Sequence, residues 1–351
     1  MILIVGAGIS GLFLGYNLYK KGIKFIILDK QSIGGKINSL YCKNGIIETA
    51  PSVIHENQDN IISLCNELGI KLKYTDSNFY SYDKLVDVKT LNHIEDRDRD
   101  YQVRDILSPQ DSSTFRESEY MLFNDWLDCV KNEGKYMYLP QGFLKLISKL
   151  YKILEKNIFK GELIKVYNRQ SETLPIMVDI LSNGIVKKST FYKIIFCTTM
   201  SQLYNINFEK QLLPKIQYTK KMESLRVYVI LDKPVKSLNS IFKYNVIYKK
   251  EFGLTIVISD YIVLLVYTDG NHALEMSKKI NEVAKFYGLD KNIKEVKTYL
   301  YKDAFDVITS KKDLNIKLEN RIYQSAFPDR KNQCWLEGNL VRCKEILDCI
   351  V

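Results

Sequence analysis

"MILIVGAGISGLFLGYNLYKKGIKFIILDK", residues 1–30, contains a complete strand, turn, helix and strand pattern. An unbroken apolar run before the turn predicts a buried strand, and helical periodicity predicts a helix from about Ser10 to Lys21. A second apolar run ends at Asp29 and predicts a second buried strand. This order is a βαβ unit, which indicates an α/β fold that starts at the beginning of the sequence.

The turn carries three glycines in the pattern Gly6-x-Gly8-x-x-Gly11. The first permits a tight turn, the second lets the backbone approach a pyrophosphate, and the third lets the helix pack closely on the strand. The helix N-terminus then presents amides to the phosphates, while the acid at the end of the second strand accepts a hydrogen bond from a ribose. The pattern predicts a dinucleotide site, whose expected contact residues are Gly6, Gly8, Ile9, Ser10, Gly11, Asp29 and Lys30.

Composition indicates a globular protein. The 351 residues are 46% apolar and 26% charged, enough to bury one large core or two modest ones. The net charge is +10, but the lysines are scattered and form no long basic run. We therefore expect a solvated, lysine-rich surface and no nucleic-acid partner, although such a charge can steer anionic ligands toward the protein.

The cysteines and histidines indicate neither disulfides nor a metal. The seven cysteines contain no CxxC pair, and no histidine stands at ligand spacing from a cysteine or carboxylate. These features favour a reduced, cytoplasmic setting and no metal site. Nothing reaches 18 consecutive apolar residues, so we expect neither a signal peptide nor a membrane span.

Further along the chain, helices and strands interleave. Residues 60–70, 139–157 and 272–286 are predicted helices, whereas residues 76–134 turn polar and resemble an inserted segment. Alternating strands are expected at "ELIKVYNR", "IMVDILSNG", "KIIFCTT", "SLRVYVIL", "NVIYK", "LTIVIS", "YIVLLVYT" and "RIYQSAF". Asn183-Gly184 is a hairpin signal, and the mixed order favours two interlaced domains over two consecutive ones.

Several motifs, taken in order, resemble the flavin-containing amine oxidase superfamily, which includes monoamine and polyamine oxidases and protoporphyrinogen oxidases. "QSIGGKINS" is similar to its extended flavin motif, with Gly34-Gly35 followed by Lys36 where the family has an arginine on the diphosphate. "GIIETAPSVIHENQDNIISLCNELGI", "YLPQGFLKLISKLYKIL", "KIIFCTTMSQL" and "YLYKDAFDV" resemble later family segments, and Tyr301 stands where a tryptophan is usual. "QCWLEGN" resembles the closing motif before the last helix.

This resemblance implies a Rossmann-like FAD-binding domain of the GR2 type, interlaced with a smaller α+β substrate domain. The expected FAD-binding segments are 1–75, 135–205 and 315–351, and the expected substrate-domain segments are 76–134 and 206–314. The chain is short for the superfamily, so we expect a reduced substrate domain.

The resemblance also implies a chemistry: oxidation of a small-molecule amine by transfer of a hydride equivalent to flavin N5, with reoxidation by dioxygen. No cysteine matches the position of covalent flavin attachment, so dissociable FAD is expected. Backbone amides around Leu336 and Glu337 would face the pyrimidine edge of the flavin. The catalytic candidates are Trp335 as an aromatic wall, Asn205 in place of a water-holding lysine, and Tyr301.

Two alternatives remain open from the sequence. The segment "PSVIHEN" resembles UDP-galactopyranose mutases, which use a flavin without net oxidation, although His55 is more simply a surface or loop histidine. Asn205, and Phe327 in place of a cofactor-binding acid, are compatible with a non-catalytic flavin-binding protein. Asp125 and Asp128 are expected on an exposed helix face, and Glu48 is expected to be structural or adjacent to the flavin.

Overall fold

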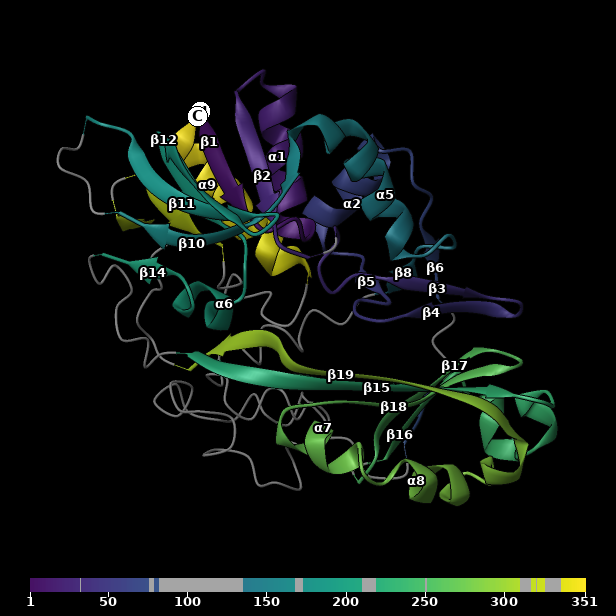
Figure 1. Ribbon diagram of the computed structural model, residues 1–351. Helices are drawn as coiled ribbons and strands as arrows, with labels where there is room; N and C mark the ends of the chain where they lie inside the picture. The colour runs from purple at the N-terminus through teal and green to yellow at the C-terminus, as the bar shows by residue number, and fades with distance from the viewer. Residues whose placement is uncertain are drawn as a thin grey trace, which may run out of the picture.

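The computed structural model describes residues 1–31, 33–75, 79–81, 135–167, 173–209, 219–249, 251–309, 317–319, 321–325 and 336–351. Within these residues the two largest sheets have six strands each (Figure 1). The first sheet contains the N-terminal βαβ unit. The second sheet lies on the far side of a β-hairpin, residues 39–48, that projects from the body of the first sheet. The molecule therefore consists of two sheet-centred bodies that meet along this hairpin.

The first sheet has the strand order β20-β21-β13-β1-β2-β9. Its members from β21 to β9 are parallel, and β20 pairs antiparallel at one edge. The strands are β1 (Ile2–Val5), β2 (Phe25–Asp29), β9 (Ile158–Lys160), β13 (Lys193–Phe196), β20 (Lys317–Glu319) and β21 (Ile322–Gln324). The predicted βαβ unit is thus confirmed, because β1 and β2 are parallel neighbours joined by a helix.

Both faces of this sheet are covered, which explains why its central strand reads as an unbroken apolar run. Ile2 and Ile4 belong to the core shared with the helices, whereas Leu3 and Val5 belong to the core shared with an antiparallel sheet. The helices are α1 (Ile9–Lys20), α2 (Asp59–Glu67), α5 (Phe143–Leu154) and α9 (Leu336–Ile350). The antiparallel sheet has the strands β12 (Ile185–Phe191), β11 (Ile176–Ser182) and β10 (Glu162–Val166), and β14 (Asn207–Phe208) joins its edge parallel to β10.

The hairpin predicted at Asn183-Gly184 is confirmed as the connection between β11 and β12. Both residues have positive φ, 50° and 76°, as a two-residue turn of this kind requires. One strand of the same sheet lies beyond the predicted boundary at residue 205, because β14 pairs with β10. The exact domain boundaries stay a prediction.

The second large sheet has the order β19-β15-β18-β17-β16-β7. Its strands are β7 (Phe79–Ser81), β15 (Thr219–Leu231), β16 (Val246–Lys249), β17 (Gly253–Ser259), β18 (Ile262–Asp269) and β19 (Ile293–Ile308). One face packs on α7 (Asn271–Met276) and α8 (Ile280–Phe286), and the other meets the hairpin of β3 (Ser39–Cys42) and β4 (Gly45–Glu48) (Figure 1).

One expectation for this body needs correction, and one of its strands was not expected from the sequence. The single helix expected at 272–286 is two helices, because residues 277–279 turn between α7 and α8, and both helices then bury apolar side chains on the same sheet. The 16-residue strand β19 did not stand out in the sequence, because most of its side chains are only half-buried or exposed. No apolar alternation therefore marks its full length.

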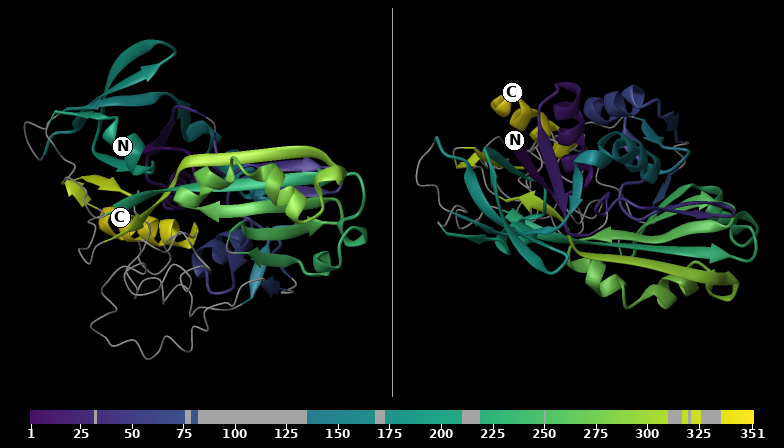
Figure 2. Two further views of the ribbon diagram at one scale, coloured as in Figure 1. Left: turned by 90° about the horizontal axis from the view of Figure 1, so that it is seen from below. Right: turned by 45° about the horizontal axis from the view of Figure 1, so that its top comes forward.

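The remaining elements are short. A small sheet contains β5 (Ile54–His55), β8 (Tyr136–Tyr138) and β6 (Lys73–Tyr74), and α6 (Met200–Tyr204) follows β13. The 3₁₀ turns are η4 (Glu155–Asn157), η5 (Val235–Ser237), η6 (Ser240–Lys243) and η7 (Asp290–Asn292). Both views in Figure 2 place the two chain ends near each other, and the Lys193 ammonium in β13 donates to the Ile350 carbonyl at 2.7 Å. In the described part of the chain, no helix combines the length and the hydropathy that a bilayer crossing requires.

The β3–β4 hairpin also caps α5. Glu48 Oε1 accepts the Phe143 amide at 2.9 Å, and Ser39 Oγ accepts the Leu144 amide at 2.9 Å while donating to Glu48 at 2.8 Å. A Cβ on Gly142 would lie 2.7 Å from Ser39 Oγ, so glycine permits this approach. Burial raises the pKa of Glu48, although the amide and hydroxyl bonds oppose that shift. Glu48 therefore has a structural role.

We predict that Ser39→Ala lowers the free energy of unfolding by about 1–2 kcal/mol, because it leaves a first-turn amide of α5 and one Glu48 oxygen without a partner. Urea denaturation of the purified protein measures this loss. Ser148→Ala is the matched control, since the exposed Ser148 hydroxyl only donates to a carbonyl of the same helix, Leu144. Equal losses in the two variants would contradict the capping role.

Candidate functional site

The glycine turn between β1 and α1 is tightly packed at two positions and open at the third. A Cβ on Gly6 would lie 2.5 Å from the Cys197 carbonyl oxygen, and one on Gly11 would lie 1.9 Å from the Gly6 carbonyl oxygen. At Gly8, by contrast, φ is −72° and nothing lies within 4 Å of the Cβ position. Gly6 and Gly11 are therefore required by the fold, whereas Gly8 leaves space beside the turn.

The same open position begins helix α1. Gly8 is the N-cap residue and supplies no capping side chain. Because first-turn amides have no carbonyl partner within their own helix, they remain available, at the positive end of the helix dipole, to an external anion. Ile9 and Ser10 lie in this first turn, as the sequence predicted. The arrangement suits a phosphate group.

The second glycine pair packs directly on this turn. The Gly34 amide donates to the Ala7 carbonyl at 2.8 Å, and a Cβ on Gly35 would lie 3.4 Å from Gly8 Cα. Both glycines have positive φ, 100° and 61°. The structure therefore brings the two glycine motifs of the sequence together at one place.

Asp29 closes this region at the end of β2. Its carboxylate accepts the Ala7 amide at 2.6 Å and the Gln31 amide at 2.7 Å. Each carboxylate oxygen can accept a further hydrogen bond, so binding of a ribose stays a prediction that this geometry permits. The Lys30 ammonium pairs with Glu162 at 3.0 Å on the protein surface, and its contact with a cofactor stays a prediction.

Lys36 was expected at a diphosphate, and here its ammonium donates to the Ala304 carbonyl of β19 at 2.7 Å. Burial lowers the pKa of Lys36, whereas the nearby carboxylates of Asp303 and Asp306 act to raise it. Burial, reinforced by Asp303, raises the pKa of Asp306 to about 6, although the Met200 amide donates to it. A buried charge cluster thus joins the glycine loop to the second sheet, and a diphosphate contact for Lys36 stays a prediction.

Two polar atoms beside this cluster have no hydrogen-bond partner. Thr199 donates to Asp303 Oδ2 at 2.7 Å and Ser201 donates to the same oxygen. Asp303 Oδ1 and Thr198 Oγ1 are buried and unpartnered within the described residues. The Thr198 side chain lies next to the turn, since its Cγ2 is 3.4 Å from the Cβ position of Gly6. A buried polar atom without a partner can still form a hydrogen bond with a water molecule or a polar ligand.

The closing motif supplies a different connection. Leu336 is the first residue of α9, and the buried carboxylate of Glu337 accepts the Asn60 amide at 2.9 Å and the Ile61 amide at 3.1 Å. Glu337 therefore caps α2 rather than leaving its own side chain free for a ligand. A cofactor contact through the backbone amides of Leu336 and Glu337 stays a prediction.

The second sheet turns a polar face toward this region. Alternation along β15 and pairing with β18 and β19 bring together the side chains of Ser224, Arg226, Tyr267, Asp269 and Tyr301, which we call the polar face. The Tyr301 hydroxyl donates to the Lys36 carbonyl at 3.5 Å, and the Arg226 guanidinium lies 3.4 Å from Ser52 Oγ. Of the five residues of the polar face, only Tyr301 was predicted as a site residue from the sequence. The missed signal is in "SLRVYVIL", where polar residues alternate with apolar ones inside a strand.

Other sequence candidates are placed less favourably or lie outside the described residues. Asn205 is exposed at the C-terminal end of α6, so its role as a water-holding residue stays a prediction. The expectation of a surface or loop histidine at His55 is wrong, because it is 6% exposed within β5. Its ring contacts Asn57 Oδ1 at 2.5 Å and the edge of Tyr136. The candidates that lie outside the described part are Trp335, Phe327, Asp125 and Asp128.

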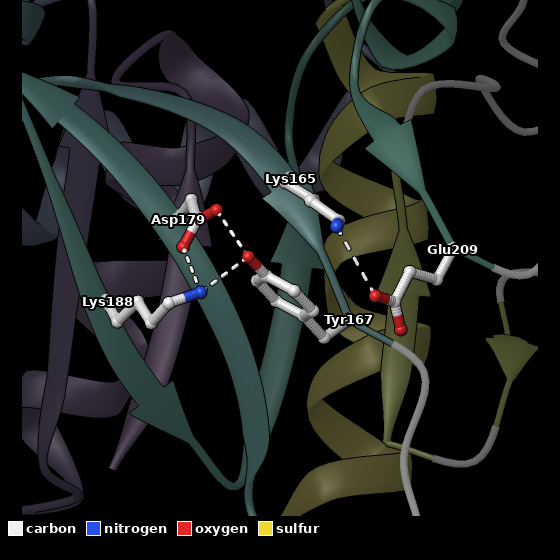
Figure 3. A network of polar contacts seen from close by, with 5 residues as sticks. All are labelled: Lys165, Tyr167, Asp179, Lys188 and Glu209. Atoms are coloured by element: carbon white, nitrogen blue, oxygen red, sulfur yellow. Dashed lines mark hydrogen bonds and ion pairs between the residues drawn. The ribbon is translucent and has the colours of Figure 1, made fainter.

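A second polar cluster lies on the sheet that contains β10, β11 and β12 (Figure 3). The Tyr167 ring has the ammonium groups of Lys165 and Lys188 at 4.1 and 4.2 Å from its centroid. The Tyr167 hydroxyl donates to Asp179 at 2.7 Å, and Lys165 pairs with Glu209 at 3.3 Å. Every charge in this cluster has a partner, so it fastens β14 to the sheet and presents no free group to a ligand.

Comparisons with known proteins agree with this geometry. The family model described as flavin containing amine oxidoreductase matches residues 9–163, which include α1 with Gly11, the second glycine pair and α5. A structure of putrescine oxidase bound to putrescine is 13% identical, with a TM-score of 0.73, and the alignment covers 99% of this chain and 98% of that one. A double mutant of putrescine oxidase, from a redesign of cofactor binding, is 12% identical with a TM-score of 0.70 and the same coverage. The fold is therefore that of the FAD-binding amine oxidases.

We predict that Asp306→Asn stabilises the protein near neutral pH. The pKa of Asp306 is raised in the folded state to about 6, so the protonated form is favoured and folding loses stability as the pH rises through that value. Relative to the variant, the wild type should lose up to about 3 kcal/mol between pH 4 and pH 7.

Urea denaturation at several pH values measures this difference. The exposed Asp232 provides a control, since Asp232→Asn replaces a carboxylate on the surface and should change stability only slightly. A constant difference between wild type and Asp306→Asn across this pH range would contradict the assignment.

Proposed function

We propose that the chain belongs to the flavin-containing amine oxidase superfamily and is an FAD-dependent oxidoreductase that oxidises an amine, which the family-model match and the putrescine oxidase fold support. The observation that carries this proposal is the open space at Gly8, next to an uncapped helix N-terminus and the Gly34-Gly35 backbone. These three features form a cradle that a side chain at Gly8 would partly fill. They fit the diphosphate of a dinucleotide.

The residues present fit the other parts of FAD as well. Asp29 would accept a ribose hydroxyl, and the first-turn amides of α9 at Leu336 and Glu337 would face the pyrimidine edge. The unpartnered atoms Asp303 Oδ1 and Thr198 Oγ1 suit a ligand with several hydroxyl groups, such as the ribityl chain. They would compensate for Phe327, which stands where relatives have a cofactor-binding acid. We propose that the FAD is held without a covalent bond.

When bound, the flavin would accept a hydride equivalent from the carbon next to the amine nitrogen and pass the electrons to dioxygen. The chain's own contribution is to hold the substrate amine between the glycine loops and the polar face of the second sheet. Tyr301 lies on that face and its hydroxyl reaches the Lys36 carbonyl, which fixes β19 against the glycine loop. Tyr301, Trp335 and Asn205 remain the proposed catalytic residues.

The purified protein should show a flavin absorbance band near about 450 nm, either as isolated or after incubation with FAD, and denaturation should release the flavin. In the absence of oxygen, one member of an amine panel should bleach this band, and admission of air should restore it with formation of peroxide. Absence of flavin binding under both conditions would overturn the proposal. Bound flavin that no amine reduces would leave a flavin-binding protein without amine oxidation.

We predict that Gly8→Ala weakens FAD binding without unfolding the protein, because the backbone at Gly8 accepts any residue and no protein atom lies within 4 Å of the added carbon. The added methyl group should instead block the approach of the phosphates, and the dissociation constant should rise by about tenfold or more. Fluorescence titration with FAD measures the affinity, and thermal denaturation without FAD tests the fold.

Gly11→Ala provides the contrast in the same turn. Its Cβ would lie 1.9 Å from the Gly6 carbonyl oxygen, so this variant should lose thermal stability even without FAD. If the two variants behaved alike in both measurements, the distinction between a ligand-facing and a packing glycine would be wrong.

A further inference from the structure

Arg226 is a buried cation on the polar face of the second sheet. Its side chain is 7% exposed, and its guanidinium stacks 4.4 Å from the centroid of the Tyr267 ring. Its guanidinium makes a long hydrogen bond, 3.4 Å from Nη1 to Ser52 Oγ, and a second hydrogen bond to the Tyr228 side chain. A guanidinium has five N–H donors, so these two bonds leave donors for another group.

No carboxylate neutralises this cation within ion-pair distance in the described part of the chain. Two acids lie near enough to interact with Arg226 electrostatically. The charge of Asp269 acts to raise the pKa of Arg226, and the charge of Arg226 acts to lower the pKa of Glu48. The Glu48 oxygens are taken by Ser39 and Phe143. A buried charge without a hydrogen-bonded counter-ion is costly, and proteins retain such charges where a ligand supplies the partner.

Asp269 is the second unusual group of the polar face. It is 3% exposed, and its Oδ1 atom has no partner among the described residues. Burial raises the pKa of Asp269 to about 6, against hydrogen bonds from Ser224 and Tyr267 and the charge of Arg226. At neutral pH the face therefore carries one cation and one carboxylate that are not within ion-pair distance of each other.

The position of Arg226 links it to the proposed active site. Ser52 belongs to the segment between β4 and β5, which lies inside the region that matches the family model. One step along the same face, Ser224 pairs with Tyr301, whose hydroxyl reaches Lys36 in the glycine loop. Arg226 thus faces the same body that holds the glycine cradle, and it comes from the opposite sheet.

We propose that Arg226 binds the carboxylate of the substrate, and that the oxidised amine therefore belongs to the amino acids rather than to simple amines or diamines. A planar guanidinium matches a carboxylate in a bidentate geometry. The Asp269 carboxylate on the same face, whose Oδ1 atom has no partner among the described residues, favours a ligand of both charges over a simple anion. This inference rests on the proposed amine oxidation and narrows its substrate class.

The test compares amino acids with the amines that lack only the carboxylate, such as leucine with isopentylamine, tyrosine with tyramine and lysine with cadaverine. Calorimetric titration of the flavin-loaded protein without oxygen measures binding, and bleaching of the flavin band measures reduction. At least one amino acid should bind about 10- to 100-fold more tightly than its matched amine, as expected for a charge-assisted hydrogen-bonded pair.

Variants then assign the preference to Arg226. Arg226→Met should weaken binding of that amino acid by about 10- to 100-fold and change binding of the matched amine by less than about threefold. Arg226→Lys keeps the buried cation but loses the planar fork, so its effect should be intermediate. Lys297→Met is the control, because it removes a surface cation of the same sheet that pairs with Glu295.

The outcomes separate this inference from the proposed function. If simple amines bind and reduce the flavin and no amino acid binds, amine oxidation stands and the carboxylate site is overturned. If an amino acid binds through Arg226 without reducing the flavin, the carboxylate site stands and amine oxidation fails. The wild-type comparison decides even if Arg226→Met does not fold, and equal weakening of both ligands in Arg226→Lys would also overturn the inference.

Discussion

The close approach of Gly11 to the Gly6 carbonyl is the constraint on which the structure depends. Because a Cβ on Gly11 would lie only 1.9 Å from that oxygen, α1 can sit directly on the turn after β1 only if this residue is glycine. The same turn also packs against the end of β13 through Gly6 and Cys197, and the second glycine pair packs on Gly8. The position of the α1 N-terminus, and with it that of the proposed anion site, follows from these backbone contacts.

Two buried acids stabilise the helices around that site. Glu48 caps α5 from the β3–β4 hairpin, and Glu337 caps α2 from α9, across 277 residues of sequence. Each carboxylate accepts backbone amides that would otherwise lack a partner, which offsets the cost of its burial. The acid of the closing motif therefore orients α9 against α2, and this leaves the N-terminal amides of α9 as the part of the motif that could meet a cofactor.

The two faces of the second sheet differ in composition. One face stabilises the fold, and the other carries the polar groups that we propose for ligand recognition. One face is uniformly apolar and packs on α7 and α8, whereas the other combines an apolar patch on the β3–β4 hairpin with the polar face around Arg226. Buried polar groups cost stability unless they are satisfied, so their concentration on the face turned to the glycine loops indicates a binding role. Asp269, Asp303 and Thr198 each have a buried polar atom without a partner among the described residues, and they lie on this side of the molecule or at its contact with β13.

The sequence by itself determined the local elements and the first half of the site. The βαβ unit, the Asn183-Gly184 hairpin, most strands and the roles of Gly6, Gly8 and Gly11 follow from periodicity and turn chemistry, which act over a few residues. Only the tertiary structure decided that Lys36 reaches Ala304, that Glu337 caps α2, that residues 272–286 form two helices, and that the Arg226 guanidinium approaches Ser52. These features depend on which distant segments meet and in which register, and a one-residue shift in β15 would have turned Arg226 to the opposite face.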